Sequence, residues 1–120
     1  MTSKYKQLVG QEGENLAESY LKKNGFIIVS KNFRFKKIGE IDLIAQKNNL
    51  LLFVEVKNRK TNQYGGARYS LSSRKKRSFK IVANQFLNLN SEFNNTQTTC
   101  RFDLISIKNG LIEWIEDIFR

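Results

Sequence analysis

Residues 39–57 read GEIDLIAQKNNLLLFVEVK, in which two largely apolar runs flank the dipeptide Asn48-Asn49. Apolar runs on either side of a short polar step predict a β-hairpin. Asparagine adopts the left-handed backbone of a tight turn more readily than most residues, so the turn is expected at Asn48-Asn49. The stretch therefore predicts two long antiparallel strands, around which the rest of the fold is built.

The predicted hairpin brings three carboxylates and a lysine together. Residues equally distant from the turn are partners, so Asp42 lies opposite Glu55 and Glu40 lies opposite Lys57. All four side chains are expected on one face, where opposed carboxylates repel each other. Three acids directed to one spot predict a cation site, and the lysine indicates chemistry on a phosphate. The alternative is a ladder of cross-strand ion pairs on a solvated face, and pairing with Lys57 would by itself explain Glu40.

The composition narrows the possible chemistry. A chain of 120 residues predicts one domain over 1–120. The absence of histidine excludes Ser-His and Cys-His catalysis, so hydrolysis would depend on carboxylates, lysine and a metal. The single cysteine, Cys100, excludes an intramolecular disulfide and is expected to be a small buried side chain. We expect a cytoplasmic protein with no membrane contact, because no apolar run approaches about 18 residues.

The net charge of +10 is unevenly distributed, because no acidic residue lies between Glu55 and Glu92. A small acidic cluster within basic surroundings suits a metal-dependent enzyme that acts on a polyanion. The basic residues expected to bind nucleic acid are Arg34, Lys36, Lys37, Arg59, Lys60, Arg74, Lys75, Lys76, Arg77 and Lys80. For residues 74–80 the alternative is a solvated helix face, although a basic run at a helix start opposes the helix dipole.

The remaining chain predicts an α/β domain with a mixed sheet and a helix on each side. A helix is predicted over residues 72–89, capped by Ser72 or Ser73. A polar loop is predicted over 58–71, and a turn at Asn109-Gly110. The other predicted elements are a helix over 4–24, strands over 26–29, 33–37 and 101–107, and a strand or short helix over 111–119.

The acids and the lysine of the hairpin also resemble a known signature. Asp42 followed by Glu55-Val56-Lys57 is similar to the motif of the PD-(D/E)XK nucleases, which include restriction enzymes, repair nucleases and archaeal Holliday-junction resolvases. Over most of its length the chain resembles the YraN family, a group of small bacterial proteins. That resemblance is carried by Gly10, Gly13-Glu14, Ala17, Tyr20-Leu21, Gly25, Asn32, Arg34, residues 39–44, residues 53–57, Arg59, Gly65 and Arg101-Phe102-Asp103.

The resemblance implies a restriction-endonuclease-like fold, with three α/β/α layers and a mixed central sheet. It implies that Asp42 and Glu55 hold a divalent metal and that Lys57 assists the attacking water. Glu14 matches an additional metal-binding acid, although an ordinary acid near a helix N-terminus is the alternative. Glu40 is a candidate for a position in a wider shell of acids around the metal ion, or for a ligand of a second metal ion. Ile41 stands in place of the proline of the motif's name, which leaves the role of Asp42 intact.

Together these features predict a metal-dependent endonuclease. Carboxylate oxygens suit Mg²⁺ or Mn²⁺, which can stabilise an anionic transition state and activate water. We expect DNA as the substrate, in repair or recombination, with contacts mostly to phosphate. Two alternatives remain open: a nucleic-acid-binding protein without activity on the same scaffold, and a nuclease directed to RNA. A homodimer is expected by analogy with resolvase-like proteins only.

Overall fold

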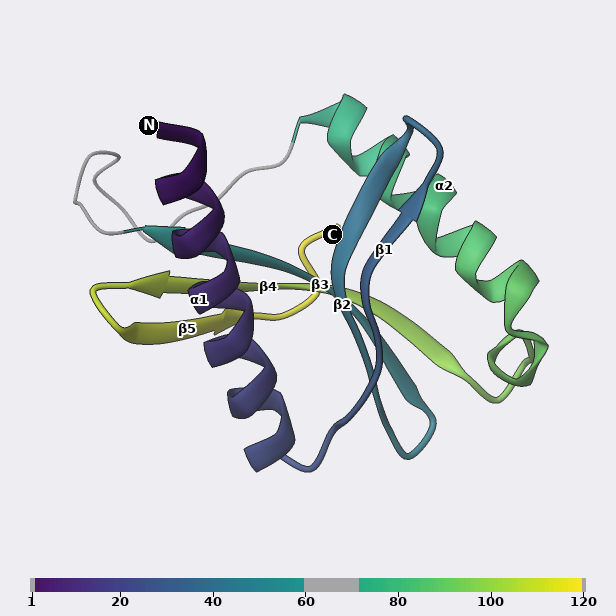
Figure 1. Ribbon diagram of the computed structural model, residues 1–120. Helices are drawn as coiled ribbons and strands as arrows, with labels where there is room; N and C mark the ends of the chain where they lie inside the picture. The colour runs from purple at the N-terminus through teal and green to yellow at the C-terminus, as the bar shows by residue number, and fades with distance from the viewer. Residues whose placement is uncertain (1, 60–71, 120) are drawn as a thin grey trace.

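The computed structural model describes residues 2–59 and 72–119, which form two helices, a short 3₁₀ helix and a five-stranded sheet (Figure 1). The sheet has the order β1-β2-β3-β4-β5, in which β3 and β4 are parallel and the other neighbours are antiparallel. The elements are α1 (Thr2–Lys23), β1 (Ile27–Phe35), β2 (Gly39–Lys47), β3 (Leu50–Arg59), α2 (Ser73–Leu89), η1 (Ser91–Phe93), β4 (Thr99–Lys108) and β5 (Leu111–Ile115).

Each face of the sheet is covered by one helix, which confirms the three-layer α/β/α prediction. On one face Leu21 of α1 packs with Leu52 and Val54 of β3. On the other, Val82 and Phe86 of α2 are among the residues that pack with the intervening residues of β3. Since β3 is covered on both sides, its apolar run is continuous rather than alternating. Neither helix in these ranges has the length and apolar character needed to cross a membrane.

The predicted hairpin register is confirmed where β2 and β3 pair. Leu43 pairs with Val54 and Lys47 with Leu50, on either side of a turn in which Asn48 has φ of 54°. The second predicted turn is also present, between β4 and β5, at Asn109-Gly110. Ser72 caps α2 by accepting a hydrogen bond of 3.1 Å from the backbone N–H of Lys75.

Four details differ from the expectations. The strands predicted over 26–29 and 33–37 are one strand, β1, because a bulge between Ile28 and Ser30 lets it stay paired with β2. The last strand ends at Ile115, and Cys100 is exposed rather than buried. The predicted loop over 58–71 begins later, since β3 continues to Arg59; residues 60–71 lie outside the described residues.

Helix α1 approaches β3 closely at Gly13. A Cβ atom added at this buried glycine would lie 2.7 Å from Cβ of Asn58, which real Cβ atoms essentially never do. A residue without a side chain is therefore needed to seat α1 on β3, and the next residue along α1 is the candidate metal ligand Glu14.

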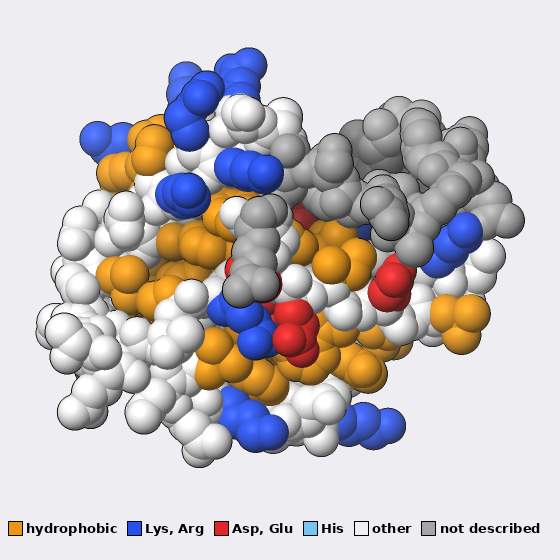
Figure 2. Space-filling view, turned by 180° about the vertical axis from the view of Figure 1, so that it is seen from behind, with side chains coloured by type: hydrophobic (Ala, Val, Ile, Leu, Met, Phe, Trp, Pro, Cys, Tyr) orange, Lys and Arg blue, Asp and Glu red, His pale blue; other side chains and the backbone are white. Residues whose placement is uncertain are grey.

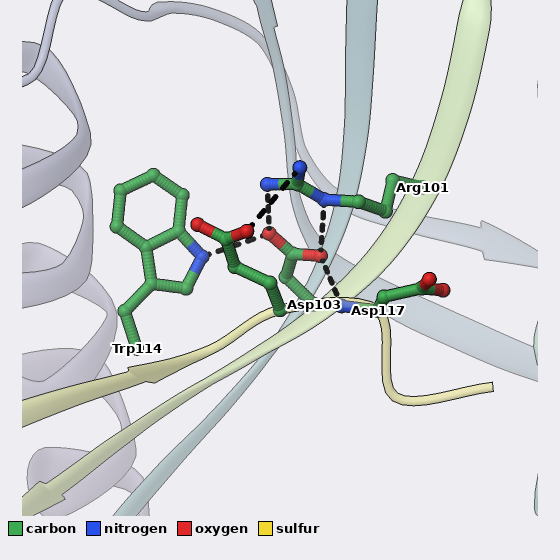
Figure 3. Close-up of polar contacts among 5 residues, drawn as sticks. Arg101, Asp103, Trp114 and Asp117 are labelled. Atoms are coloured by element: carbon green, nitrogen blue, oxygen red, sulfur yellow. Dashed lines mark hydrogen bonds and ion pairs between the residues drawn. The ribbon is translucent and has the colours of Figure 1, made fainter. Parts of the chain in front are cut away.

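A buried carboxylate holds the C-terminal segment against β4 (Figure 3). Asp103 is fully buried and accepts hydrogen bonds of 2.9 Å from both Nε and Nη2 of Arg101. It accepts two more, from Trp114 Nε1 at 2.8 Å and from the backbone N–H of Asp117 at 2.9 Å. Removing one partner of such a buried, paired carboxylate is costly, because the remaining group loses its compensating charge and hydrogen bonds.

The segment held by Asp103 reaches the beginning of α2. The ring of Phe119 stacks on Phe102 at a centroid distance of 4.3 Å and on Phe79 of α2 at 6.2 Å. The ammonium of Lys80 lies 5.7 Å from the centre of the same ring. These contacts position the first turns of α2 relative to the sheet.

Gly13→Ala is expected to lower the free energy of unfolding by about 1–3 kcal/mol, because the added methyl group overlaps Asn58. Gly10→Ala is the matched control in the same helix, at an exposed position where an added Cβ meets nothing within 4 Å. It should raise the free energy of unfolding by up to about 1 kcal/mol through helix propensity. Urea denaturation followed by circular dichroism measures the free energy of unfolding of both variants. Equal changes in Gly13→Ala and Gly10→Ala would contradict the close approach of α1 to Asn58.

Asp103→Asn is expected to lower the free energy of unfolding by about 3 kcal/mol, because it leaves Arg101 beside a buried group without the opposite charge. Glu116→Gln is the control: its carboxylate lies 3.5 Å from Arg101 Nη1 but its side chain is 60% exposed, so we expect a change below about 0.5 kcal/mol. Similar losses in the two variants, measured by urea denaturation, would show that burial of Asp103 is not what matters.

Candidate active site

The sheet divides at the point where β2 and β3 carry their acids. Pairing between these strands runs from the turn only as far as Leu43 and Val54. Beyond that point β2 remains paired with β1 and β3 with β4, and the two halves diverge (Figure 1). Asp42 lies at the fork, where its Oδ2 accepts a hydrogen bond of 2.8 Å from the backbone N–H of Val56. A side chain therefore replaces the next step of strand pairing.

The fork changes the chemistry of Asp42. Burial, together with the negative charges of Glu55, Glu14 and Glu40, raises the pKa of its carboxyl from 3.8 to about 7, although the hydrogen bond from Val56 opposes the shift. A carboxylate in such surroundings is stabilised by binding either a proton or a cation.

Glu55 lies on β3, is 7% exposed and is neutralised by lysines from two elements. Its Oε2 lies 3.0 Å from Nζ of Lys75, on the first turn of α2, and 3.9 Å from Nζ of Lys57, two residues along β3. The sequence predicted that Lys57 would lie near the acids. It assigned Lys75 to nucleic-acid binding alone, because nothing local indicates that the crossover helix returns to this point.

Glu14 reaches the site from α1. Asn32 of β1, in the left-handed region at φ of 52°, donates a hydrogen bond of 3.0 Å from Nδ2 to Glu14 Oε1. Burial and the charge of Glu40 raise the pKa of Glu14. Since α1 begins at Thr2, the alternative of an acid at a helix N-terminus is wrong.

Glu40 has a different partner from the one predicted. The sequence placed it opposite Lys57, whereas the structure pairs it across β1 and β2 with Arg34, whose Nη2 lies 3.6 Å from Glu40 Oε1. The reason is the fork. Pairing between β2 and β3 ends at Leu43, so Glu40 has a paired neighbour on β1 only. Glu40 nevertheless stays close enough for its charge to act on both Glu14 and Asp42.

A cleft of about 430 Å³ lies between the start of β2 and the start of α2. The β2 side is acidic, with Glu40 and Asp42, and the α2 side is basic, with Arg74 and Lys75. The capped N-terminus of α2 borders it, and the partial positive charge of a helix N-terminus favours anions. Among the described residues, the cleft is lined by Ile38, Gly39, Glu40, Asp42, Ser72, Arg74, Lys75, Ser78 and Phe79.

The other predicted nucleic-acid residues are more dispersed. Lys36 and Lys37 are exposed in the β1–β2 turn. Arg77 is exposed about 200° around the helix from Lys75, while Lys80 borders a separate hollow of about 190 Å³. Figure 2 shows Lys and Arg side chains gathered at the upper edge, where Figure 1 places the start of α2 and the β1–β2 turn. Lys76 is half-buried, the side chain of Arg59 is not described, and Lys60 lies outside the described residues.

The donor set suits a hard divalent cation, since carboxylate oxygens are the ligands that Mg²⁺ and Mn²⁺ prefer. Asp42 and Glu55 approach from the two arms of the fork, and the charge of Glu14 acts on Asp42. Within residues 2–59 and 72–119, no three acidic or cysteine side chains are already arranged to share one ion. Glu55 faces Lys75 instead, so a shared ion requires side chains to turn.

Asn32 is a site residue that the sequence did not identify, although it belongs to the family resemblance. Its signal was an asparagine within a strand, where asparagine is disfavoured unless the backbone or a side-chain hydrogen bond requires it. In the structure both reasons apply, because Asn32 has positive φ and contacts Glu14.

Asp42→Asn should stabilise the protein at pH 8 by about 2 kcal/mol, because asparagine can still accept from Val56 but cannot ionise. With a folded-state pKa of about 7 and an ordinary value of 3.8, protonated Asp42 contributes stability fully below about pH 4. That contribution is lost as the pH rises through 7. The advantage of the variant over wild type should therefore shrink from pH 8 to pH 4.

Urea denaturation across this pH range, without added metal, measures the difference between the two proteins. Glu92→Gln, which neutralises an exposed acid of η1, is the control and should show no such trend. A constant difference between Asp42→Asn and wild type from pH 4 to pH 8 would contradict burial of an ionisable group.

Comparisons with known proteins agree on one family. The chain is 43% identical over 110 residues to a UPF0102 protein of Shewanella sediminis, covering 92% of this chain and 90% of the relative. It is 41% identical to one of Saccharophagus degradans, covering 92% and 91%, and 37% identical to one of Shewanella oneidensis, covering 92% and 98%. Residues 13–107 match the model of the uncharacterised protein family UPF0102. The chain therefore belongs to UPF0102, the YraN family.

Proposed function

We propose that this protein is a metal-dependent endonuclease that hydrolyses phosphodiester bonds in DNA during repair or recombination. The proposal rests mainly on the pair Asp42 and Glu55. Both are largely withdrawn from solvent at the fork, and the cleft that Asp42 lines is basic on its opposite side. Burying opposed carboxylates is costly, so their retention beside a cleft favours a binding or catalytic role.

Asp42, Glu55 and Glu14 would hold Mg²⁺ or Mn²⁺, with Glu40 in a wider shell. When bound, the ion would supply positive charge to the phosphate and lower the pKa of a water molecule. Lys57, whose ammonium lies 3.9 Å from Glu55, would add positive charge beside the scissile phosphate or orient the water. Asn32 would orient Glu14 through its hydrogen bond.

The basic side of the cleft supports a polyanionic substrate. Arg74 and Lys75 border the cleft beside the N-terminus of α2, which together suit a phosphate group. The exposed Lys36 and Lys37 lie in the turn at the start of β2 and would extend the contact along the backbone. Phosphate contacts carry little sequence information, so recognition would depend on the shape of the nucleic acid.

Asp42→Asn and Glu55→Gln are each expected to reduce Mg²⁺-dependent cleavage of a four-way DNA junction by about 100-fold or more, since each removes a proposed metal ligand. Junction binding should remain equal or become tighter, because each variant removes negative charge. Cleavage is measured on labelled junctions and binding by fluorescence anisotropy.

Glu92→Gln removes an exposed acid from η1 and should cleave like wild type. Cleavage that survives both site substitutions would exclude this site. Salt-sensitive junction binding without any product, in wild type as well, would favour the non-catalytic alternative. Preferential cleavage of a matched RNA junction would favour the RNA-directed one.

A further inference from the structure

In the ion pair between Lys75 and Glu55, the acid is buried whereas the lysine is partly exposed and has a flexible side chain. Glu55 is 7% exposed, whereas the side chain of Lys75 is 41% exposed and its Nζ lies 3.0 Å from Glu55 Oε2. Lysine carries its charge on a flexible four-carbon stem, so its ammonium can move while its Cα stays on the first turn of α2. The same ammonium lies 5.5 Å from the centre of the Phe79 ring, which also lines the cleft.

A divalent cation and Lys75 would compete for Glu55. The ammonium lies at hydrogen-bonding distance from a carboxylate oxygen that the proposed metal would need. Two positive charges that close together repel strongly at a site with little solvent. The ammonium therefore has to leave Glu55 when a metal ion is bound there.

The cleft offers Lys75 another partner when nucleic acid is present. Lys75 and Arg74 both border it, beside the capped start of α2. A phosphate bound there would attract the ammonium through a charge-assisted hydrogen bond. Lys75 would then be drawn away from Glu55 by the substrate itself.

We propose that Lys75 and the metal ion exchange on Glu55, so that binding of nucleic-acid phosphate strengthens metal binding. This inference rests on the proposed function and adds its regulation: metal is bound weakly until a substrate releases Glu55. Because coupling between two ligands is reciprocal, metal should strengthen nucleic-acid binding by the same factor.

The test is isothermal titration with Mn²⁺, with and without a four-way DNA junction whose phosphorothioate linkages resist cleavage. For wild type the junction should tighten Mn²⁺ binding by about fivefold or more. Lys75→Gln should bind Mn²⁺ about fivefold or more tightly than wild type without DNA, and most of the tightening by DNA should disappear. Titrations of Mn²⁺ into the junction alone are subtracted.

Two further variants define the controls. Lys22→Gln makes the same change in α1, where Lys22 Nζ lies 2.8 Å from Glu18 Oε2 and neither residue lines the cleft, and it should behave like wild type. Lys75→Arg keeps the positive charge and should retain weak binding without DNA, which tests the idea even if Lys75→Gln is unstable.

The outcomes separate the two proposals. If wild type binds Mn²⁺ and Lys75→Gln binds it no more tightly, or keeps the full DNA effect, the exchange is overturned and the metal site stands. If no variant binds Mn²⁺, even with the junction present, the metal site and the exchange are both overturned.

Discussion

The hydrogen bond from the Val56 backbone to the Asp42 carboxylate is the interaction on which the site depends. A buried backbone N–H needs an acceptor, and in a continuous sheet the neighbouring strand would provide it. Here the carboxylate provides it, so β2 can leave β3 without an unsatisfied group at Val56. The opening lets side chains from both helices approach the acids, since Lys75 of α2 pairs with Glu55 and the charge of Glu14 of α1 acts on Asp42.

The charges at the fork are compensated by elements that lie far apart in the chain. Buried carboxylates are tolerated only with opposite charges or hydrogen bonds nearby. Glu55 forms ion pairs with Lys75 and Lys57, and Glu40 forms one with Arg34. Glu14 accepts a hydrogen bond from Asn32. Asp42 has no cation paired with it in the ion pairs described above, and its raised pKa indicates that its negative charge is poorly compensated. The cations and the amide of the protein thus compensate part of the negative charge, while the raised pKa values of Asp42 and Glu14 indicate that a further positive charge would stabilise the cluster.

Asp103 shows how a structural carboxylate differs from the acids at the fork. It is fully buried, but it accepts four hydrogen bonds, two of them from a guanidinium whose charge neutralises it. Its effect is to hold the C-terminal segment, and through Phe119 and Phe79 the start of α2. Gly13 acts similarly for α1, because its missing side chain allows the helix to seat on β3 one residue before Glu14. Asp103 and Gly13 therefore position α2 and α1, the two helices that carry Lys75 and Glu14 of the site.

Much of the fold was predictable from local patterns, and the site only in part. Hairpin register follows from residues near Asn48-Asn49, and the start of α2 follows from the cap at Ser72, because turns and caps depend on a few neighbouring residues. The candidate acids were also evident, since carboxylates in a buried run need an explanation. The divergence of β2 and β3 was not predictable, because strand alternation assumes that pairing continues.

The sequence by itself determined which residues could form strands and helices, and that acids and cations would be plentiful near the hairpin. Only the tertiary structure decided their partners: Lys75 with Glu55, Arg34 with Glu40 and Asn32 with Glu14. The physical reason is that local periodicity specifies which face a side chain occupies. Which distant element comes to that face depends on packing of the whole domain, here on a sheet that opens at Asp42.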